Sequence, residues 1–171
     1  MILVALGANL DSPVHGPPRA TLEAALSRLD EHGVILVRRS RWFKSAPVPI
    51  SDDPWFVNGV ARVETVMDPH ELMQILHEVE AEFGRVRTVP NAPRILDLDL
   101  LDFRGLCLDG PPLQLPHPRM VGRPFVLLPL RDVASSWVDP RSGRDINALI
   151  EELPSDVHTE PMLDVYPQPE S

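Results

Sequence analysis

Cysteine is almost absent from this chain, since Cys107 is the only one among 171 residues. A single thiol excludes an internal disulfide and a zinc site built from several thiolates. Apolar runs are also short: none approaches the roughly 20 residues that a membrane-spanning helix needs. The apolar opening at 2–8 has no basic flank, which favours a first strand over a signal peptide. We therefore expect a cytoplasmic protein without a membrane partner.

Basic residues are in deficit, with 16 Lys and Arg against 25 Asp and Glu and a net charge of −9. A general nucleic-acid surface would need the opposite balance, so no nucleic-acid partner is expected. The familiar phosphate-binding motifs are missing as well. There is no G-x-x-x-x-G-K-[ST] loop, and Gly7-Ala8-Asn9 does not complete a G-x-G-x-x-G fingerprint.

Hydrophobic periodicity predicts the element order β-α-β-β-α-β in the first two thirds of the chain. The clearest helix begins with Asp68 as N-cap and Pro69 at the first helical position, and it ends at Gly84. This order is typical of an α+β, ferredoxin-like fold, with an antiparallel sheet and the helices on one face. The expected strands cover 2–8, 34–44, 56–65 and 95–103, and the expected helices cover 18–32 and 69–83.

The remainder of the chain is rich in proline and turn residues. It carries one short expected helix near 123–131 and a last helix over 145–153. We expect a single, monomeric domain over residues 1–153 with this segment as a C-terminal extension. The stretch 154–171 has little apolar content and is expected to be a flexible tail.

The acidic pair in DLDLLDF is the first candidate site. Asp97 and Asp99 are two residues apart on an expected strand, so their side chains point to the same face. Two neighbouring carboxylates repel unless a cation lies between them, and Mg²⁺ favours one or two carboxylates together with phosphate oxygens. A solvent-facing acidic edge strand would show the same spacing.

Basic residues precede this strand at Arg85, Arg87 and Arg94. The planar guanidinium suits phosphate oxygens, although a solvated basic loop would have the same composition. Arginines beside a carboxylate pair favour a phosphate-plus-metal site more than either feature does separately. His117 and Arg123 follow in the turn-rich PHPRMVGRPF, where a histidine with a purely structural role is the alternative.

Five segments occur in a characteristic order along the chain. They are ALGANL at 5–10, FVNGV at 56–60, GRVR at 84–87, APRILDLDLL at 92–101 and LPHPRMVGRPFVLLPL at 115–130. Over roughly residues 1–150, these segments resemble the 6-hydroxymethyl-7,8-dihydropterin pyrophosphokinase family. The resemblance implies a ferredoxin-like enzyme of folate biosynthesis that transfers a pyrophosphoryl group from ATP to the pterin and releases AMP. It also implies two Mg²⁺ ions and no partners beyond these small molecules.

The resemblance also implies residue roles. Asp97 and Asp99 would hold the metal, and Arg85 and Arg94 would stabilise the transferring phosphate groups. The residues implied in ATP binding are His77, Glu80, Arg87, His117 and Arg123. Those implied in pterin binding are Ser45, Ala46, Val48, Phe56, Asn58 and Phe125, with the ring stacked between the two phenylalanines and hydrogen-bonded to the asparagine.

Two departures from the family pattern bear on these roles. The stretch 88–94 (TVPNAPR) is short and lacks the tryptophan and extra basic residues often found there, and Phe56 stands where tyrosine is common. Two other functions fit the residues without the resemblance. One is a ligand-binding regulatory module without chemistry, and the other is a two-metal nucleotidyltransferase or phosphohydrolase with a different acceptor.

Overall fold

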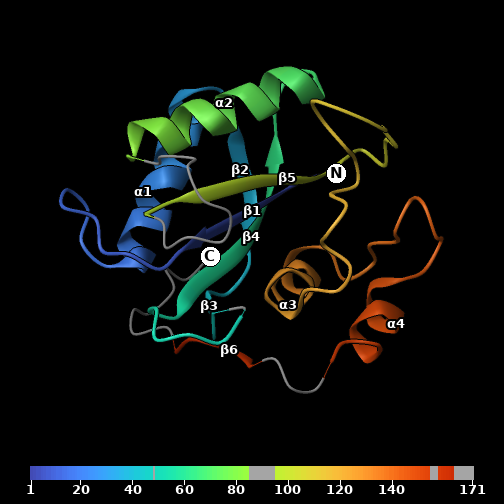
Figure 1. Ribbon diagram of the computed structural model, residues 1–171. Helices are drawn as coiled ribbons and strands as arrows, with labels where there is room; N and C mark the ends of the chain where they lie inside the picture. Colours follow the sequence, from blue (N-terminus) through green and yellow to red (C-terminus); the bar gives the residue numbers. More distant parts are fainter. Residues whose placement is uncertain (48, 85–94, 155–157, 164–171) are drawn as a thin grey trace, which may run out of the picture.

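The computed structural model describes residues 1–47, 49–84, 95–154 and 158–163. Within them the chain forms an open antiparallel sheet of six strands and four helices (Figure 1). The strands are β1 (Ile2–Ala8), β2 (Ile35–Arg39), β3 (Phe43–Ser45), β4 (Phe56–Glu64), β5 (Asp97–Phe103) and β6 (Thr159–Pro161). The helices are α1 (Pro18–Glu31), α2 (Pro69–Glu82), α3 (Pro124–Val133) and α4 (Ile146–Glu151).

The strands lie in the order β5-β1-β4-β3-β6. β2 pairs with the second half of β4, and β3 pairs with its first half. The first strand therefore lies inside the sheet, between β4 and the edge strand β5, and it is antiparallel to both. The predicted α+β class is confirmed. The observed order up to β5 is β-α-β-β-β-α-β, with one strand more than predicted, because the segment expected as a single second strand forms both β2 and β3. No helix in the described ranges is both long and apolar enough to cross a membrane.

One face of the sheet is covered by α1 and α2. Alternate residues of the strands, among them Leu6, Val57 and Leu98, join Leu22 and Leu76 of these helices in one buried cluster. The helix signals read from the sequence are also present. The Asp68 carboxylate accepts the backbone N–H of Glu71, while Gly33 and Gly84 follow α1 and α2 with positive φ.

The opposite face is covered too, which the sequence prediction of helices on one face did not include. α3 and α4 pack there, and Leu3, Val60 and Leu101 of the strands meet Leu127 and Ile146 in a second buried cluster. In Figure 1, α2 (green) and α3 (orange) lie on different sides of the sheet. Part of the predicted extension therefore forms a third layer. This layer of α3 and α4 partly covers the face of the sheet that bears Asp97 and Asp99.

The single strand expected over 34–44 is interrupted between β2 and β3. The Ser40 hydroxyl accepts the N–H of Val60 at 2.9 Å, and the N–H of Arg41 donates to the Asp132 carboxylate at 2.9 Å. Side chains therefore take over ladder hydrogen bonds at this point, and the strand bends around the fully buried Trp42.

Part of the expected flexible tail is a strand. Residues Thr159–Pro161 form β6, which pairs antiparallel with β3. The prediction is wrong for this segment because the outer edge of β3 offers unpaired backbone groups that a short extended segment can satisfy. Pro161 opposes Phe43, and the flanking hydrogen bonds make this a non-hydrogen-bonded pair, so the missing N–H of proline costs nothing.

Candidate active site

A row of three residues crosses the middle of the sheet. Gly7 of β1 is paired with Asp97 of β5 on one side and with Asn58 of β4 on the other. Directly paired residues share a face, and neighbouring strands lie about 4.8 Å apart, so the acid and the amide are about 10 Å apart across the glycine. This spacing leaves room for a flat ring above Gly7.

The amide of Asn58 is held from two sides. Its Nδ2 donates to the Ser45 Oγ at 2.7 Å, and both side chains are buried. Its Oδ1 lies over Gly7, where an added Cβ would be only 2.9 Å away. The close approach therefore requires glycine at position 7, and it sets the direction of the amide beside the open space.

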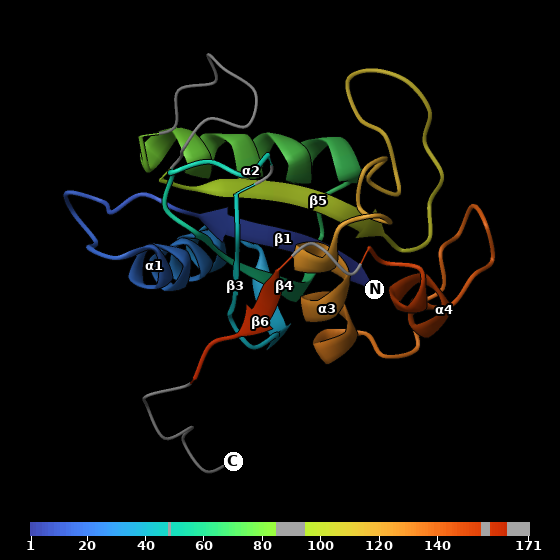
Figure 2. The ribbon, with the colours of Figure 1, turned by 60° about the horizontal axis from the view of Figure 1, so that its bottom comes forward.

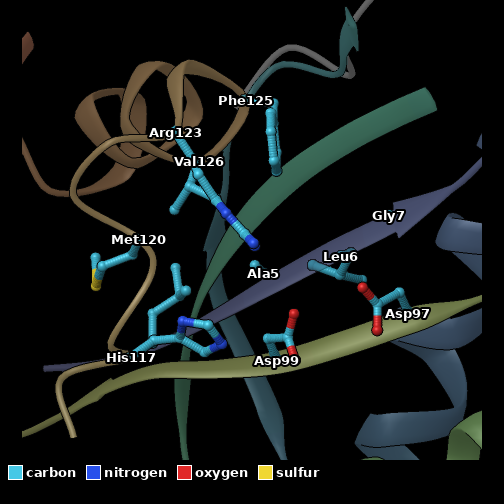
Figure 3. Close-up of a pocket in the computed structure, with 11 residues that line it drawn as sticks. Ala5, Leu6, Gly7, Asp97, Asp99, His117, Met120, Arg123, Phe125 and Val126 are labelled. Atoms are coloured by element: carbon cyan, nitrogen blue, oxygen red, sulfur yellow. The ribbon is translucent and has the colours of Figure 1, made fainter. Parts of the chain in front are cut away.

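An open pocket, with about 380 Å³ of empty space when its opening to solvent is included, lies over Gly7 and Asp97 of this row, beneath the start of α3 (Figure 3). Asp97 and Asp99 rise into it from β5, and both are half-buried. The two carboxylates therefore share one face, as the spacing predicted, with open space beside them. The remaining chemically active groups around the pocket are His117, Arg123 and Phe125.

Arg123 and Phe125 come from the first turn of α3. Arg123 is the N-cap residue, and Pro124 occupies the first helical position. The guanidinium carbon lies 5.5 Å from the centre of the Phe125 ring, and Figure 3 shows the side chain reaching down into the pocket. The cap geometry thus presents a cation and an aromatic ring to the same space.

His117 is half-buried at the boundary of this pocket. Burial, followed by the nearby charges of Arg123 and Arg119, lowers the pKa of His117 from its ordinary 6.5 to about 4, against an opposing effect of Asp97. Its Nδ1 accepts the N–H of Arg119 at 3.2 Å. The neutral ring therefore carries its proton on Nε2, where it can donate to a ligand oxygen.

A second, larger pocket with about 970 Å³ of empty space lies between α2, β5 and residues 110–118. His77 of α2 is on its wall, and Asp99 and His117 line both this pocket and the smaller one. The two pockets therefore adjoin at these two side chains. Such an arrangement suits a reaction between two ligands, each in its own pocket.

Glu80 lies on α2, and the role in ATP binding that the family resemblance implies for it stays a prediction. Its side chain is buried between α2 and β5, where the carboxylate accepts the N–H of Leu98 at 2.9 Å. Leu98 lies between the two aspartates, so Glu80 holds the backbone from which they project. Neither of the two pockets, as far as the described residues line them, includes Glu80.

The structure brings together most of the site residues predicted from the sequence. Phe56 lies two residues before Asn58 on the same face of β4, opposite Ser45 of β3. Ala46 follows β3, and its N–H donates to the carbonyl of His158 at 3.1 Å. Four predicted residues lie outside the described residues: Val48, Arg85, Arg87 and Arg94.

Gly7 is the site residue that the sequence analysis missed. The only signal was a glycine inside an otherwise apolar strand, which often marks the close approach of another group. Its partners Asn58 and Asp97 are more than 50 positions away in the chain, so nothing local connects them.

The groups of the site that could hold a metal ion are carboxylates. In the described part of the chain, no group of three or more His, Cys, Asp or Glu side chains is close enough to hold a metal. Asp97 and Asp99 are therefore a two-carboxylate set. That is the protein contribution expected for Mg²⁺, which completes its octahedron with water and phosphate oxygens.

The two adjoining pockets are lined by two carboxylates, a guanidinium and a neutral imidazole. This combination of groups is typical of an enzyme that acts on phosphate groups. The chain belongs to the 7,8-dihydro-6-hydroxymethylpterin-pyrophosphokinase (HPPK) family, whose model it matches over residues 3–135. The family was expected from the sequence motifs, and the expectation is confirmed.

Individual relatives support the same assignment. The chain is 41% identical over 156 residues to a 2-amino-4-hydroxy-6-hydroxymethyldihydropteridine pyrophosphokinase of Pseudomonas aeruginosa, covering 90% of this chain and 91% of that protein. A protein of the same name from Synechocystis is 39% identical over 152 residues, covering 88% and 75%. The mitochondrial folate synthesis bifunctional protein of Pisum sativum is 31% identical over 138 residues, and this chain spans only 26% of its length.

Proposed function

We propose that this chain transfers the pyrophosphoryl group of ATP to the hydroxymethyl oxygen of 6-hydroxymethyl-7,8-dihydropterin and releases AMP. The observation that carries the proposal is the boundary between the two pockets, because Asp99 and His117 line both. A nucleotide in the larger pocket and an alcohol in the smaller one would meet at β5. Membership of the HPPK family supports this pair of substrates.

The pterin is assigned to the smaller pocket, with its ring over Gly7. The Asn58 amide offers a donor and an acceptor to the edge of the heterocycle, and Phe125 offers a ring face. Phe56 is assigned to the other face of the ring. Ser45, Ala46 and Val48 are assigned to the wall, the last on the family resemblance alone.

Asp97 and Asp99 are the residues that we assign to Mg²⁺, with two ions expected. Bound Mg²⁺ would supply neutralisation of the phosphate charge and a lower pKa of the attacking alcohol. This assignment needs no protein base, and we name none. It rests on the half-buried pair of carboxylates beside open space.

The other groups of the chain bind and orient the nucleotide. Arg123 compensates charge that develops on the transferring phosphates, and the neutral His117 donates from Nε2 to a phosphate oxygen. His77 is assigned to the nucleotide in the larger pocket. Arg85, Arg87 and Arg94 are assigned to the phosphates by the family resemblance alone.

The test is the release of AMP from ATP, Mg²⁺ and hydroxymethyldihydropterin by the purified protein. Asp97→Ala and Asp99→Ala are each expected to lower kcat at least about a hundredfold, because a metal ligand contributes several kcal/mol to the transition state. Asp30→Ala is the matched control, since this exposed aspartate lies on α1 at the other face of the sheet. It should leave kcat unchanged.

Product identity separates this function from its rivals. Inorganic phosphate or pyrophosphate in place of AMP would indicate a phosphohydrolase or a nucleotidyltransferase. Metal-independent ligand binding without turnover would indicate a regulatory module. Undiminished AMP release by Asp97→Ala would contradict the assigned roles even if the wild-type protein is active.

We further propose that the protein is a cytoplasmic monomer. Sedimentation velocity of the purified protein would measure its mass in solution and so test the monomeric state.

A further inference from the structure

The C-terminal strand β6 is joined to β3 by backbone hydrogen bonds at both ends. The N–H of Ala46 donates to the carbonyl of His158 at 3.1 Å, and the N–H of Met162 donates to the carbonyl of Trp42 at 2.8 Å. Because hydrogen-bonded pairs alternate in an antiparallel ladder, Lys44 and Glu160 between them form the next such pair. Figure 2 shows β6 (red) beside β3.

Side chains add to this attachment. Lys44 Nζ of β3 lies 2.9 Å from the Glu160 carboxylate of β6, and within the C-terminal segment His158 Nε2 lies 2.9 Å from the other oxygen of the same carboxylate. The ring of His158 also meets that of Trp55 edge to face, with 5.1 Å between the ring centres. The strand therefore touches both ends of the loop that joins β3 to β4.

Those two ends are next to the residues assigned to the pterin. Ser45, which accepts the Asn58 amide, is the last residue of β3, and Phe56 follows Trp55 directly. β3 is only three residues long, and without β6 it would be the outer strand at this end of the sheet. Short edge strands open readily, and any movement of Ser45 would release the amide.

We propose that residues His158–Met162 position the pterin-binding wall by holding β3 and the start of β4 in place. The segment itself need not touch the substrate. It acts by pre-organising Ser45 and Asn58, so that less conformational entropy is lost when the pterin binds. The inference rests on the proposed function, because Ser45 and Asn58 are assigned to the pterin there.

The test uses the full chain with Glu160→Pro, which removes the central N–H that β6 directs at β3. The KM for hydroxymethyldihydropterin is expected to rise about tenfold, or about 1.4 kcal/mol. The KM for ATP is expected to change less than about twofold, because the second pocket lies on the other side of β5. Loss of overall stability alone would not produce such a split.

Two matched variants isolate the cause. Leu163→Pro also introduces a proline, but residue 163 is 88% exposed and its N–H points away from β3 in the alternating ladder, so both KM values should stay at wild type. Glu160→Ala removes the ion pairs and keeps the backbone N–H, so the pterin KM should rise only about two- to threefold.

Three outcomes would overturn the inference. An unchanged pterin KM in folded Glu160→Pro is one, and an equal rise of both KM values is another. If Glu160→Pro does not fold, the double variant His158→Ala/Glu160→Ala decides, and an unchanged pterin KM there is the third. Asn58→Ala separates this failure from that of the proposed function: if Asn58→Ala leaves the pterin KM unchanged, the pocket assignment itself is wrong.

Discussion

Gly7 matters to the site because it has no side chain. The Asn58 oxygen occupies the space where a Cβ would stand, and that Cβ would be 2.9 Å from it. Asn58 cannot move aside easily, because it is buried and bonded to Ser45. At the scale of single residues, the site therefore depends on close packing of an amide against a backbone.

Gly7→Ala is expected to raise the pterin KM by about tenfold, a loss of about 1.4 kcal/mol, because the amide must turn away from the ring. The ATP KM should stay close to wild type. Steady-state kinetics with each substrate varied in turn measures this. Gly122→Ala is the control, since a Cβ there meets nothing within 4 Å. Equal effects of the two variants would contradict the packing argument.

His117 is expected to make the stability of the protein depend on pH. Its folded pKa of about 4 lies below the ordinary 6.5, so between these values the unfolded chain takes up a proton that the folded chain does not. The free energy of unfolding of the ligand-free protein should therefore fall as the pH is lowered from about 6.5 to about 4. His117→Asn should lose this component of the fall.

Urea unfolding of both proteins at pH 7 and pH 5 measures the difference. The gap between wild type and His117→Asn should change in favour of the variant at the lower pH. A gap that is the same at both pH values would show that the pKa of His117 is not lowered in the folded protein.

At the scale of elements, the contact of α2 with β5 sets the direction of the two aspartates. Glu80 accepts the N–H of Leu98, and both residues are buried. Glu80→Ala would leave that N–H without an acceptor, which costs about 1–3 kcal/mol. We also expect kcat to fall, because Asp97 and Asp99 flank the loosened peptide.

Glu80→Gln tests whether hydrogen bonding is the cause, since its amide oxygen can still accept from Leu98. Urea unfolding and kcat should both return towards wild type in this variant. If Glu80→Gln is as impaired as Glu80→Ala in kcat but not in stability, Glu80 acts on the nucleotide directly, as the family resemblance implied.

At the scale of the whole molecule, the site needs a layer on each face of the sheet. The layer of α3 and α4, which presents Arg123 and Phe125, is tied to β5 by Trp137. The indole Nε1 donates to the buried Asp102 carboxylate at 2.7 Å. The layer that covers the pocket is therefore hydrogen-bonded to β5, the strand that carries Asp97 and Asp99.

Trp137→Phe is expected to destabilise the protein by about 1–3 kcal/mol, because it leaves the Asp102 oxygen buried without this donor. Thermal unfolding measures the change, and the double variant Trp137→Phe/Asp102→Asn should recover part of it. A wild-type melting temperature for Trp137→Phe would show that packing alone holds this layer.

Local signals in the sequence were sufficient for the four helices, for most of the strands and for part of the site. Asp68, Pro69 and Gly84 delimit α2 through capping chemistry that acts within one turn. The two-residue period of a strand places Asp97 and Asp99 on one face whatever surrounds them. The short helix expected near 123–131, which begins beside Arg123 and contains Phe125, is observed over Pro124–Val133.

Tertiary structure alone decided which distant residues meet. Strand pairing places Gly7 between Asp97 and Asn58 and sets β6 beside β3. The packing of α2 on the sheet directs Glu80 at the N–H of Leu98. Pairing depends on the summed packing of both faces of the sheet, and a shift by one residue would reverse every side chain. The sequence by itself therefore determined which groups are available, while the register of the sheet determined which of them share a pocket.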